Sequence, residues 1–333
     1  MKAIVYRAYG SPDVLHLEDI EKPTPGDGEV LVRIHAAAAN PLDYHFMGGA
    51  YIIRPITGFR KPKPTVPGAD LAGEVEAVGR NVTRFQPGDR VFGGLRRTFA
   101  EYVCASENRL ASMPANLTFE QAAALPVAGL TALQGLRDKG RVQPGQSVLV
   151  NGAAGGVGTF AVQVAKSLGA EVTGVCSTGS VDLVRSLGAD HVIDYTRDDC
   201  TRGRRQYDVI FDGVGNRPLS DWRRVMTPRG TFVPVGVRHG GRWIGPLPYL
   251  LKLFASAPFV SQNVPFFVAR VSSEELIALG DLVEANEVTP VIDRRYTLSE
   301  APEAIRYLQQ GHARGKVVVT VEHAQAAPVI FPR

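Results

Sequence analysis

The stretch NGAAGGVG, residues 151–158, lies between the strand-like SVLV of residues 147–150 and the helix-like TFAVQVAKSLGA of residues 159–170. Apolar residues recur at helical spacing from Val157 to Leu168, which specifies one buried face of a helix. A buried strand that passes through a glycine turn into a helix points free backbone N–H groups and the positive end of the helix dipole at one place. The stretch therefore predicts an anion-binding turn, with a plain structural turn as the alternative.

The glycine spacing matches the GxGxxG fingerprint of dinucleotide-binding folds except at its first position. Ala153 replaces the first glycine, and Gly155 and Gly158 match the second and third. In that fingerprint the second glycine lets the backbone approach the pyrophosphate, and the third lets the helix pack closely on the strand. Because a strand precedes the turn and a helix follows it, we favour a dinucleotide site. The predicted cradle comprises Gly152, Ala153, Gly155, Gly156, Val157 and Gly158.

The chain on either side of this turn has two textures. The first third is rich in β-branched residues, glycine and proline in short runs bounded by turns, which predicts a β-rich, barrel-like domain. From Ser147 onward, strand-like and helix-like runs alternate, as in βαβ units that form a parallel sheet with helices on both faces. The segment after Val271 has no nucleotide motif, so we expect it to return and complete the first domain. The predicted fold class is α/β.

Composition and charge limit the classes of function. The 333 residues are enough for about two domains, and the 44% hydrophobic and 21% charged content is typical of a soluble globular protein. A net charge of +4, without long runs of like charge, gives no reason to expect nucleic acid as a partner. No signal peptide and no membrane span of roughly 20 apolar residues is evident, so we expect a cytoplasmic protein. The three cysteines lack CxxC spacing and are expected to be reduced and mostly buried.

The end of the second predicted strand of the parallel sheet, EVTGVCST, bears on the choice of nicotinamide cofactor. NAD enzymes usually place Asp or Glu there, roughly 20 residues past the glycines, to bind the ribose hydroxyls. Cys176, Ser177 and Thr178 occupy that place here, and two hydroxyls can donate to a 2′-phosphate. No Arg or Lys follows immediately, so Tyr195 and Arg314 are expected to reach the site from elsewhere in the chain. The sequence favours NADPH over NADH.

Several longer stretches support a family assignment. They are MKAIVYRAYGSPDVLHLEDIEKPTPGDGEVLVRIHAAAANPLD, PGADLAGEVEAVG, FQPGDRVFGG, LPVAGLTALQGLRDKGRVQPGQSVLVNGAAGGVG and GHARGKVVV. In these stretches the chain resembles the medium-chain dehydrogenase/reductase superfamily and, within it, the zinc-independent quinone oxidoreductase family. The resemblance implies a GroES-like β-barrel catalytic domain, residues 1–124 and 273–333, and a Rossmann domain with a doubly wound parallel sheet, residues 125–272. It also implies an active site in the cleft between them and, as is common in the family, a homodimer.

The same comparison argues against zinc. Zinc alcohol dehydrogenases of the superfamily have a cysteine where this chain has Asn40, and Gly-His-Glu where it has Gly68-Ala69-Asp70. Catalytic zinc needs about three protein ligands, whereas the seven histidines are scattered, so we expect no metal. Without a Lewis acid, a quinone or an α,β-unsaturated carbonyl is the expected hydride acceptor, because its developing charge spreads onto an oxygen that hydrogen bonds can stabilise.

The candidate catalytic residues are Asn40, Tyr44 and Tyr51, as donors to that oxygen. The resemblance places Asn40 beside the nicotinamide and the cleft, with a loop-capping amide as the alternative, and Tyr44 is either a donor or an aromatic wall. Thr131 occupies the place where the family brings a threonine to the cofactor, with helix packing as the alternative. The carboxyl ends of two later strands are expected to line the nicotinamide site. They contribute Gly213, Val214, Gly215, Val235 and Gly236.

Some alternatives stay open. The basic stretch Arg54–Gly68 either covers the cleft, binds an anionic substrate or is a solvated proline-rich loop. The apolar stretch of residues 246–260 is expected to be a lid or interface helix. An enoyl-thioester reductase, whose substrate would bring an acyl carrier or coenzyme A to the basic stretch, is an alternative function. A non-catalytic NADPH-binding protein is another.

Overall fold

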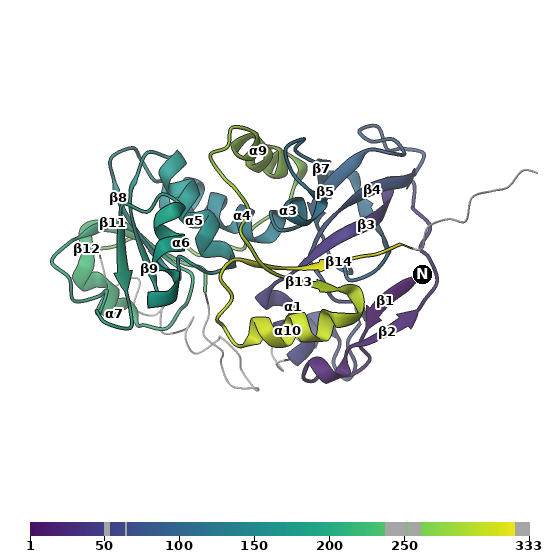
Figure 1. Cartoon of the computed structure of the whole chain (residues 1–333), viewed down its shortest axis with the longest axis horizontal. Coiled ribbons are helices and arrows are strands. Elements are labelled where there is room, and N and C mark those ends of the chain that lie inside the picture. The colour runs from purple at the N-terminus through teal and green to yellow at the C-terminus, as the bar shows by residue number, and fades with distance from the viewer. Residues whose placement is uncertain (50–53, 64, 237–250, 252–260, 324–333) are drawn as a thin grey trace, which may run out of the picture.

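The computed structural model describes residues 1–49, 54–63, 65–236, 251 and 261–323, and these residues form two lobes, each built on a sheet (Figure 1). The lobe that carries the glycine turn has five strands in the order β10-β9-β8-β11-β12, and all neighbours are parallel. These strands are β8 (Ser147–Asn151), β9 (Glu171–Cys176), β10 (His191–Asp194), β11 (Tyr207–Asp212) and β12 (Met226–Pro234). This strand order is that of the Rossmann fold, and the sequence-based prediction of a doubly wound sheet is confirmed.

Helices lie on both faces of the parallel sheet. They are α5 (Gly156–Ser167), α6 (Val181–Ser186) and α7 (Leu219–Trp222), with the short 3-10 helices η5 (Thr178–Ser180) and η6 (Arg223–Val225). The central strand β8 is buried on both faces because helices cover both. Helix α5 begins at Gly156, one residue before the apolar periodicity starts at Val157, so the last glycines of the turn belong to the first turn of the helix.

The second lobe is a barrel-like sheet in the order β13-β14-β3-β4-β5-β7, with β6 paired to β3. Its strands are β3 (Glu29–Ala39), β4 (Asp70–Val78), β5 (Arg90–Gly94), β6 (Tyr102–Ser106), β7 (Leu110–Ser112), β13 (Ile292–Thr297) and β14 (Lys316–Thr320). Strands β1 (Lys2–Val5) and β2 (His16–Asp19) form a separate antiparallel pair. Because β14 pairs with β3 in antiparallel register, strands from both ends of the chain share one sheet.

Short helices complete this lobe and connect it to the other. Those in the barrel lobe are α1 (Pro41–Gly48), α2 (Arg54–Thr57), α10 (Ala301–Gln309), η1 (Pro12–Val14), η3 (Glu107–Arg109) and η8 (Leu298–Glu300). Those between the lobes are α3 (Phe119–Ala123), α4 (Pro126–Leu133), the π-helix η4 (Gln134–Gly140) and α9 (Ser273–Glu284). Pro126 separates α3 from α4, as a proline does when it starts a helix at its first position.

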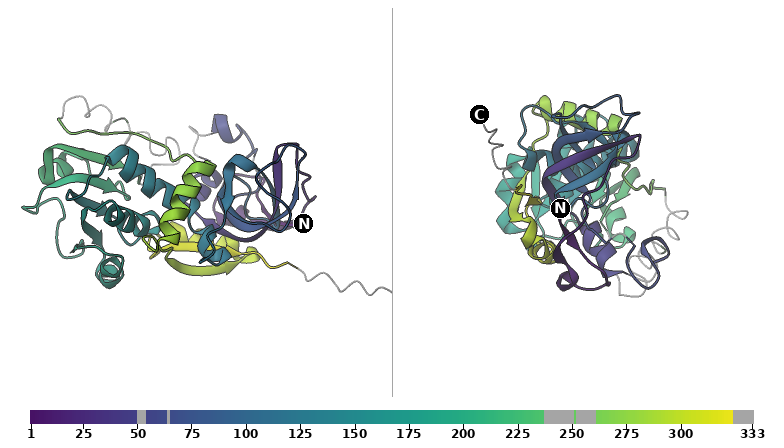
Figure 2. Two further views of the ribbon diagram at one scale, coloured as in Figure 1. Left: turned by 90° about the horizontal axis from the view of Figure 1, so that it is seen from above. Right: turned by 90° about the vertical axis from the view of Figure 1, so that its right-hand side faces the viewer.

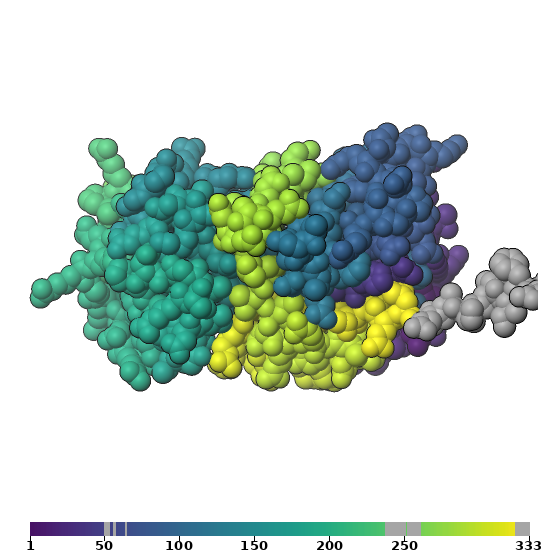
Figure 3. Space-filling model, turned by 45° about the horizontal axis from the view of Figure 1, so that its top comes forward, coloured from purple at the N-terminus to yellow at the C-terminus, as the bar shows by residue number. Residues whose placement is uncertain are grey.

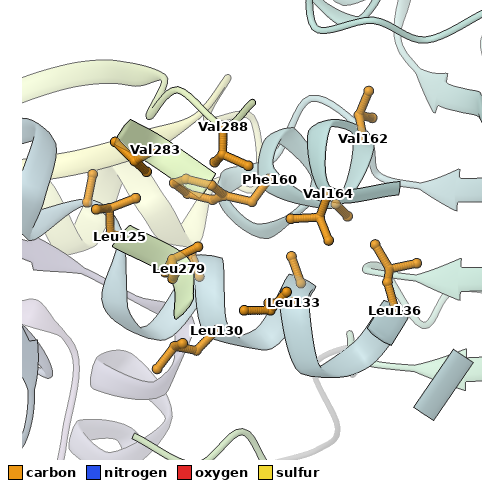
Figure 4. Packing of buried hydrophobic residues seen from close by; sticks show 14 of the residues in the cluster. Leu125, Leu130, Leu133, Leu136, Phe160, Val162, Val164, Leu279, Val283 and Val288 are labelled. Atoms are coloured by element: carbon orange, nitrogen blue, oxygen red, sulfur yellow. The ribbon is translucent and has the colours of Figure 1, made fainter. Parts of the chain in front are cut away.

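One hydrophobic core runs through both lobes. Figure 4 shows Leu130 and Leu133 of α4, Phe160 of α5 and Leu279 of α9 packed in it, and all four are almost fully buried. The same cluster extends to Phe92 of the barrel sheet. Burying side chains of this size contributes about 1.5–3 kcal/mol each. The two lobes therefore share a packed apolar interface, along which α9 and the chain after it run (Figures 2 and 3).

Two glutamines join elements that are far apart in the sequence. Gln163 of α5 donates from Nε2 to the Thr289 carbonyl (3.0 Å) and accepts from the Thr289 N–H (2.8 Å). Gln134 makes the same two-point contact with the backbone of Arg270, at 2.8 and 2.9 Å. Each amide side chain thus satisfies a backbone N–H and carbonyl that have left regular secondary structure.

Three further predictions concern the cysteines, a membrane span and the apolar stretch 246–260. Cys176 and Cys200 are buried and Cys104 is half-buried, all three are free thiols, and burial raises the pKa of each to about 11. Among the helices of the described residues, none is long and apolar enough to cross a bilayer. The apolar stretch 246–260 lies outside the described residues, apart from Leu251.

We predict that Gln163→Leu lowers the free energy of unfolding by about 2–4 kcal/mol, because two backbone groups of Thr289 lose their partner. Urea denaturation measures this loss. Gln309→Leu, an exposed change at the end of α10, is the matched control and should change stability by less than about 0.5 kcal/mol. Equal stabilities of the two variants would show that the Gln163 contact contributes nothing.

Candidate active site

The glycine turn has the space and the free donors that a diphosphate requires. A Cβ added at Gly155 would meet nothing nearer than the Gly152 carbonyl oxygen at 3.4 Å, so the turn is open on that side. At Gly158 an added Cβ would lie 2.0 Å from the same oxygen, so this glycine is needed for close packing. No side chain of the described residues caps α5, which leaves its first N–H groups without acceptors. The turn therefore fits a nucleotide diphosphate.

The ends of the parallel strands are tied together around this turn. Asp212, at the end of β11, accepts from Asn151 Nδ2 (2.8 Å) and from the N–H groups of Val214 (3.1 Å) and Gly215 (3.0 Å). Burial raises the pKa of Asp212, and these donors oppose that rise. The backbone N–H groups of Val235 and Gly236 donate to the Asp212 carbonyl. The predicted strand-end residues 213–215 and 235–236 therefore lie at the crevice where the strand order reverses, between β8 and β11.

A buried polar network connects the barrel lobe to the turn. Lys316 Nζ, on β14, donates to Asn40 Oδ1 (2.7 Å) and to Asp70 Oδ2 (3.1 Å), and Asn40 Nδ2 donates to the same Asp70 oxygen (2.9 Å). Asp70 is fully buried, and Lys316 and Asn40 are each 3% exposed. The side chain of Lys316 passes Gly156, where an added Cβ would be 3.3 Å from Lys316 Cδ. A positive charge thus lies beside the amino end of α5.

Asn40 is the predicted donor that the structure places differently. Its second N–H bond goes to the Ala38 carbonyl (3.1 Å), so both of its amide N–H bonds are already used within the protein. It also caps α1, where Asp43 Oδ2 accepts from the Asn40 backbone N–H (2.8 Å). In this structure Asn40 therefore positions Lys316, and its expected role as a donor to a substrate oxygen stays a prediction.

Asp43 is a buried carboxyl beside this network. Burial raises its pKa to about 7, although the N–H groups of Asn40 and Gly68 (3.1 Å) donate to it and favour the ionised form. Asp70 raises this pKa further and Lys316 lowers it. Asp43 therefore changes its charge near neutral pH while hydrogen-bonded to the backbone N–H of Asn40, whose side chain binds Lys316.

The other predicted residues of the barrel side and α4 have ordinary packing partners. Tyr44 packs against the barrel core, its ring 4.6 Å from that of His45, and burial raises its pKa. Thr131 donates its hydroxyl to the Val127 carbonyl of its own helix (2.6 Å), which is the helix-packing alternative. Tyr51 lies outside the described residues. Tyr44, Tyr51 and Thr131 stay predictions as site residues.

A carboxylate that was not predicted from the sequence lies beside the end of β9, on the neighbouring strand β10. Thr178 donates its hydroxyl to Asp194 Oδ2 (2.5 Å), because β10 pairs with β9 and places Asp194 opposite Cys176. Asp194 also accepts from Thr196 and pairs with Arg197 at 3.5 Å. The Thr178 hydroxyl therefore donates to an acid of this chain in the structure. Among the hydrogen bonds of the described residues, none joins the hydroxyl of the preceding Ser177 to a carboxylate.

Two further predicted residues meet this strand end. Tyr195 directly follows Asp194, is 55% exposed, and its backbone N–H donates to the Cys176 carbonyl (3.0 Å). Arg314, from the loop before β14, donates to the Gly179 carbonyl (3.1 Å) in η5. The loop before β14, which carries Arg314, thus reaches the end of β9, where the sequence predicts the adenosine ribose.

No metal centre is formed by the described part of the chain, in which no three His, Cys, Asp or Glu side chains gather closely enough to hold an ion. His35 lies on the barrel sheet, where its ring stacks on Phe119 at 4.3 Å. Burial lowers its pKa.

Sequence reasoning missed Lys316 and Asp70 as site residues, although both carried a signal. Each is a charged residue at the start of a strand whose next residues are apolar, KVVVT and DLAGEVEAV. A charge at such a position is almost never fully buried unless it is paired.

Comparison with known proteins agrees with this arrangement. Residues 26–115 match the family described as "Alcohol dehydrogenase GroES-like domain", and residues 187–319 match the one described as "Zinc-binding dehydrogenase". The chain is 34% identical to the 2-methylene-furan-3-one reductase of Solanum lycopersicum over 96% of this chain and 79% of the relative. It is also 34% identical to the chloroplastic NADPH-dependent alkenal/one oxidoreductase of Arabidopsis thaliana, with the same coverage. The solved quinone oxidoreductase of Coxiella burnetii superposes with a TM-score of 0.84 at 32% identity, covering 97% of this chain and 99% of that one.

We predict that Gly155→Val weakens NADPH binding by at least about 100-fold, because the side chain fills the open side of the turn. The backbone there is extended, with φ −77° and ψ 174°, so valine is tolerated and the melting temperature should stay within about 2 °C. Fluorescence titration with NADPH measures the first effect. Unchanged NADPH affinity in a folded Gly155→Val protein would contradict the diphosphate site. Gly158→Val should instead fail to fold stably.

We also predict that Lys316→Met lowers the free energy of unfolding by about 3–5 kcal/mol, because it leaves the Asp70 carboxylate buried without its cation. The double variant Asp70→Asn with Lys316→Met should recover more than about half of that loss, since no buried charge remains. Urea denaturation of both proteins tests this, with the exposed change Lys61→Met as the control. Additive losses in the double variant would refute the charge pairing.

Proposed function

The chain belongs to the quinone oxidoreductase family of the medium-chain dehydrogenase/reductase superfamily and is an NAD(P)H-dependent oxidoreductase, and on that premise we propose that it reduces a quinone or an α,β-unsaturated carbonyl with NADPH, without zinc. The observation that carries the proposal is the open amide turn at α5, with the Lys316 side chain passing Gly156 on its way to Asn40 and Asp70. In this proposal donors from both lobes hold one anion. The names of the relatives supply the acceptor class.

The side chains of this site have distinct roles in the proposal. The first N–H groups of α5 and Lys316 hold the diphosphate, and Asn40 and Asp70 fix the direction of the Lys316 ammonium. The loops after β11 and β12 line the nicotinamide, and Asp212 sets their conformation. A bound reduced nicotinamide supplies a hydride. The residues of the chain fix the orientation of the reactants, which accounts for a large part of the rate when the protein itself forms no covalent bond to them.

The choice of NADPH rests on the far end of the cofactor site. Ser177, Tyr195 and Arg314 are the groups proposed to receive the 2′-phosphate. In this proposal the Asp194 carboxylate does not strongly repel the 2′-phosphate. Arg197 balances its charge, and the hydroxyls of Thr178 and Thr196 already donate to its oxygens. One relative is described as NADPH-dependent. A cytoplasmic location, a homodimer and the domain boundaries given above stay predictions.

The decisive experiment follows NADPH and NADH oxidation with quinones, enones and a coenzyme A enoyl ester, together with zinc analysis of the same sample. We expect kcat/KM with NADPH to exceed that with NADH by at least about tenfold, and quinones or enones to exceed the enoyl ester. Faster reduction of the enoyl ester would favour an enoyl-thioester reductase. Tight NADPH binding without any turnover would favour a non-catalytic protein, and stoichiometric zinc would overturn the metal-free reaction.

A further inference from the structure

A small pocket lies next to the buried network, in the barrel lobe. Nine residues line it: Tyr6, Leu42, Asp43, Phe46, Val66, Pro67, Gly68, Ala69 and Arg96. We call it the Arg96 pocket. Asp43 accepts from the Asn40 N–H, and Ala69 directly precedes Asp70, so the pocket adjoins the residues that hold Lys316.

The walls of the Arg96 pocket are mostly apolar, but its mouth carries a cation. The guanidinium of Arg96 lies over the Phe46 ring, 4.8 Å from its centroid. Among the described residues, no carboxylate pairs with Arg96. The loop is held in place because the Leu95 N–H donates to the Ala69 carbonyl and the Arg97 N–H to the Gly68 carbonyl. An arginine fixed at an apolar pocket and lacking an acidic partner is suited to bind a planar oxyanion in two-point fashion.

A second donor faces the same space. The Tyr6 side chain is almost fully buried, and burial raises its pKa to about 12, with Asp43 raising it further and Arg96 lowering it. The hydroxyl therefore keeps its proton at neutral pH and can donate to an anion. The carboxyl of Asp43, which also lines the pocket, accepts from two backbone N–H groups in this structure.

The size of the pocket limits what enters. Its cavity volume is about 30 Å³, enough for about two water molecules, since one needs roughly 10–15 Å³ of such space. A group as small as a carboxylate fits this space. The exposed cations Arg60, Lys61 and Lys63 belong to the segment that leads to the wall residues Val66 and Pro67, and they add positive potential outside the pocket.

We propose that the Arg96 pocket binds a carboxylate of the substrate, so that this enzyme acts on an unsaturated ketone or quinone that carries an acid group. This inference rests on the proposed function. It answers the question left open for the basic stretch Arg54–Gly68 in favour of an anionic substrate, with Arg96 and Tyr6 as the residues that select it.

The test compares 4-oxo-4-phenylbut-2-enoic acid with its methyl ester, which has the same reactive skeleton without the charge. Calorimetry measures the affinity of each compound for the NADP⁺ complex, and NADPH oxidation measures kcat/KM. Wild-type protein should prefer the acid by at least about tenfold in both, as expected for a charge-assisted contact. The ester is the more electrophilic compound, so intrinsic reactivity alone gives the opposite order.

Two neighbouring variants separate the pocket from the general surface charge. Arg96→Gln should reduce the acid-to-ester ratio to within about threefold of one. Arg97→Asn removes the adjacent exposed charge, which does not line the pocket, and asparagine accepts its left-handed backbone (φ 78°). This control should keep the preference for the acid.

The outcomes distinguish this inference from the proposed function. A wild-type ratio near one, or an equal loss of preference in Arg96→Gln and Arg97→Asn, would refute the carboxylate pocket even if both compounds are reduced. Preferential binding of the acid without NADPH oxidation by either compound would instead refute the reductase and leave the pocket standing.

Discussion

The structure depends on one buried ion pair, between Lys316 and Asp70. Removing each ion from water costs several kcal/mol, which only close pairing and added hydrogen bonds can offset. Asn40 bonds to both partners, and Asp70 Oδ1 accepts from the Val127 N–H at the start of α4 (2.9 Å). The pair therefore fixes the last strand, the barrel sheet and the helix that connects the lobes relative to one another. The glycine turn of α5 gains its positive neighbour only when all of them are in place.

The parts of this site formed by neighbouring residues could be predicted from the sequence, and the parts formed by residues far apart in the chain could not. The turn at residues 151–158 was predicted because strand, glycines and helix follow one another in the chain, and backbone conformation is a local property. The network was not, since its partners Asp70 and Lys316 are 246 residues apart. The resemblance placed Asn40 at the site but gave no information on its hydrogen bonds. Its assignment as a donor to substrate stays a prediction for that reason.

The cofactor end shows the same limit within one sheet. Along the chain, β9 ends at Cys176 and is followed by Ser177 and Thr178, with no acid among them. A parallel sheet brings the ends of neighbouring strands together, so the acid came from β10, as Asp194. Arg314 reaches this end from the loop before β14, the strand that also carries Lys316. One short segment of the barrel lobe thus contacts both ends of the predicted cofactor site, so nucleotide binding and the packing of that segment are linked.

Asp43 gives this arrangement a pH dependence. Its pKa in the folded protein, about 7, lies above the ordinary value of an aspartate, and burial is the main cause. The folded state therefore binds a proton that the unfolded state releases between about pH 4 and pH 7. The stability that the protonated carboxyl contributes is complete below the unfolded pKa and is lost as pH rises through about 7. Above that pH, a second negative charge faces Asp70 and competes for Lys316. The hold of Asn40 and Asp70 on the ammonium should therefore weaken in alkaline solution, because Lys316 is the one cation that Asp43 and Asp70 share in the described network.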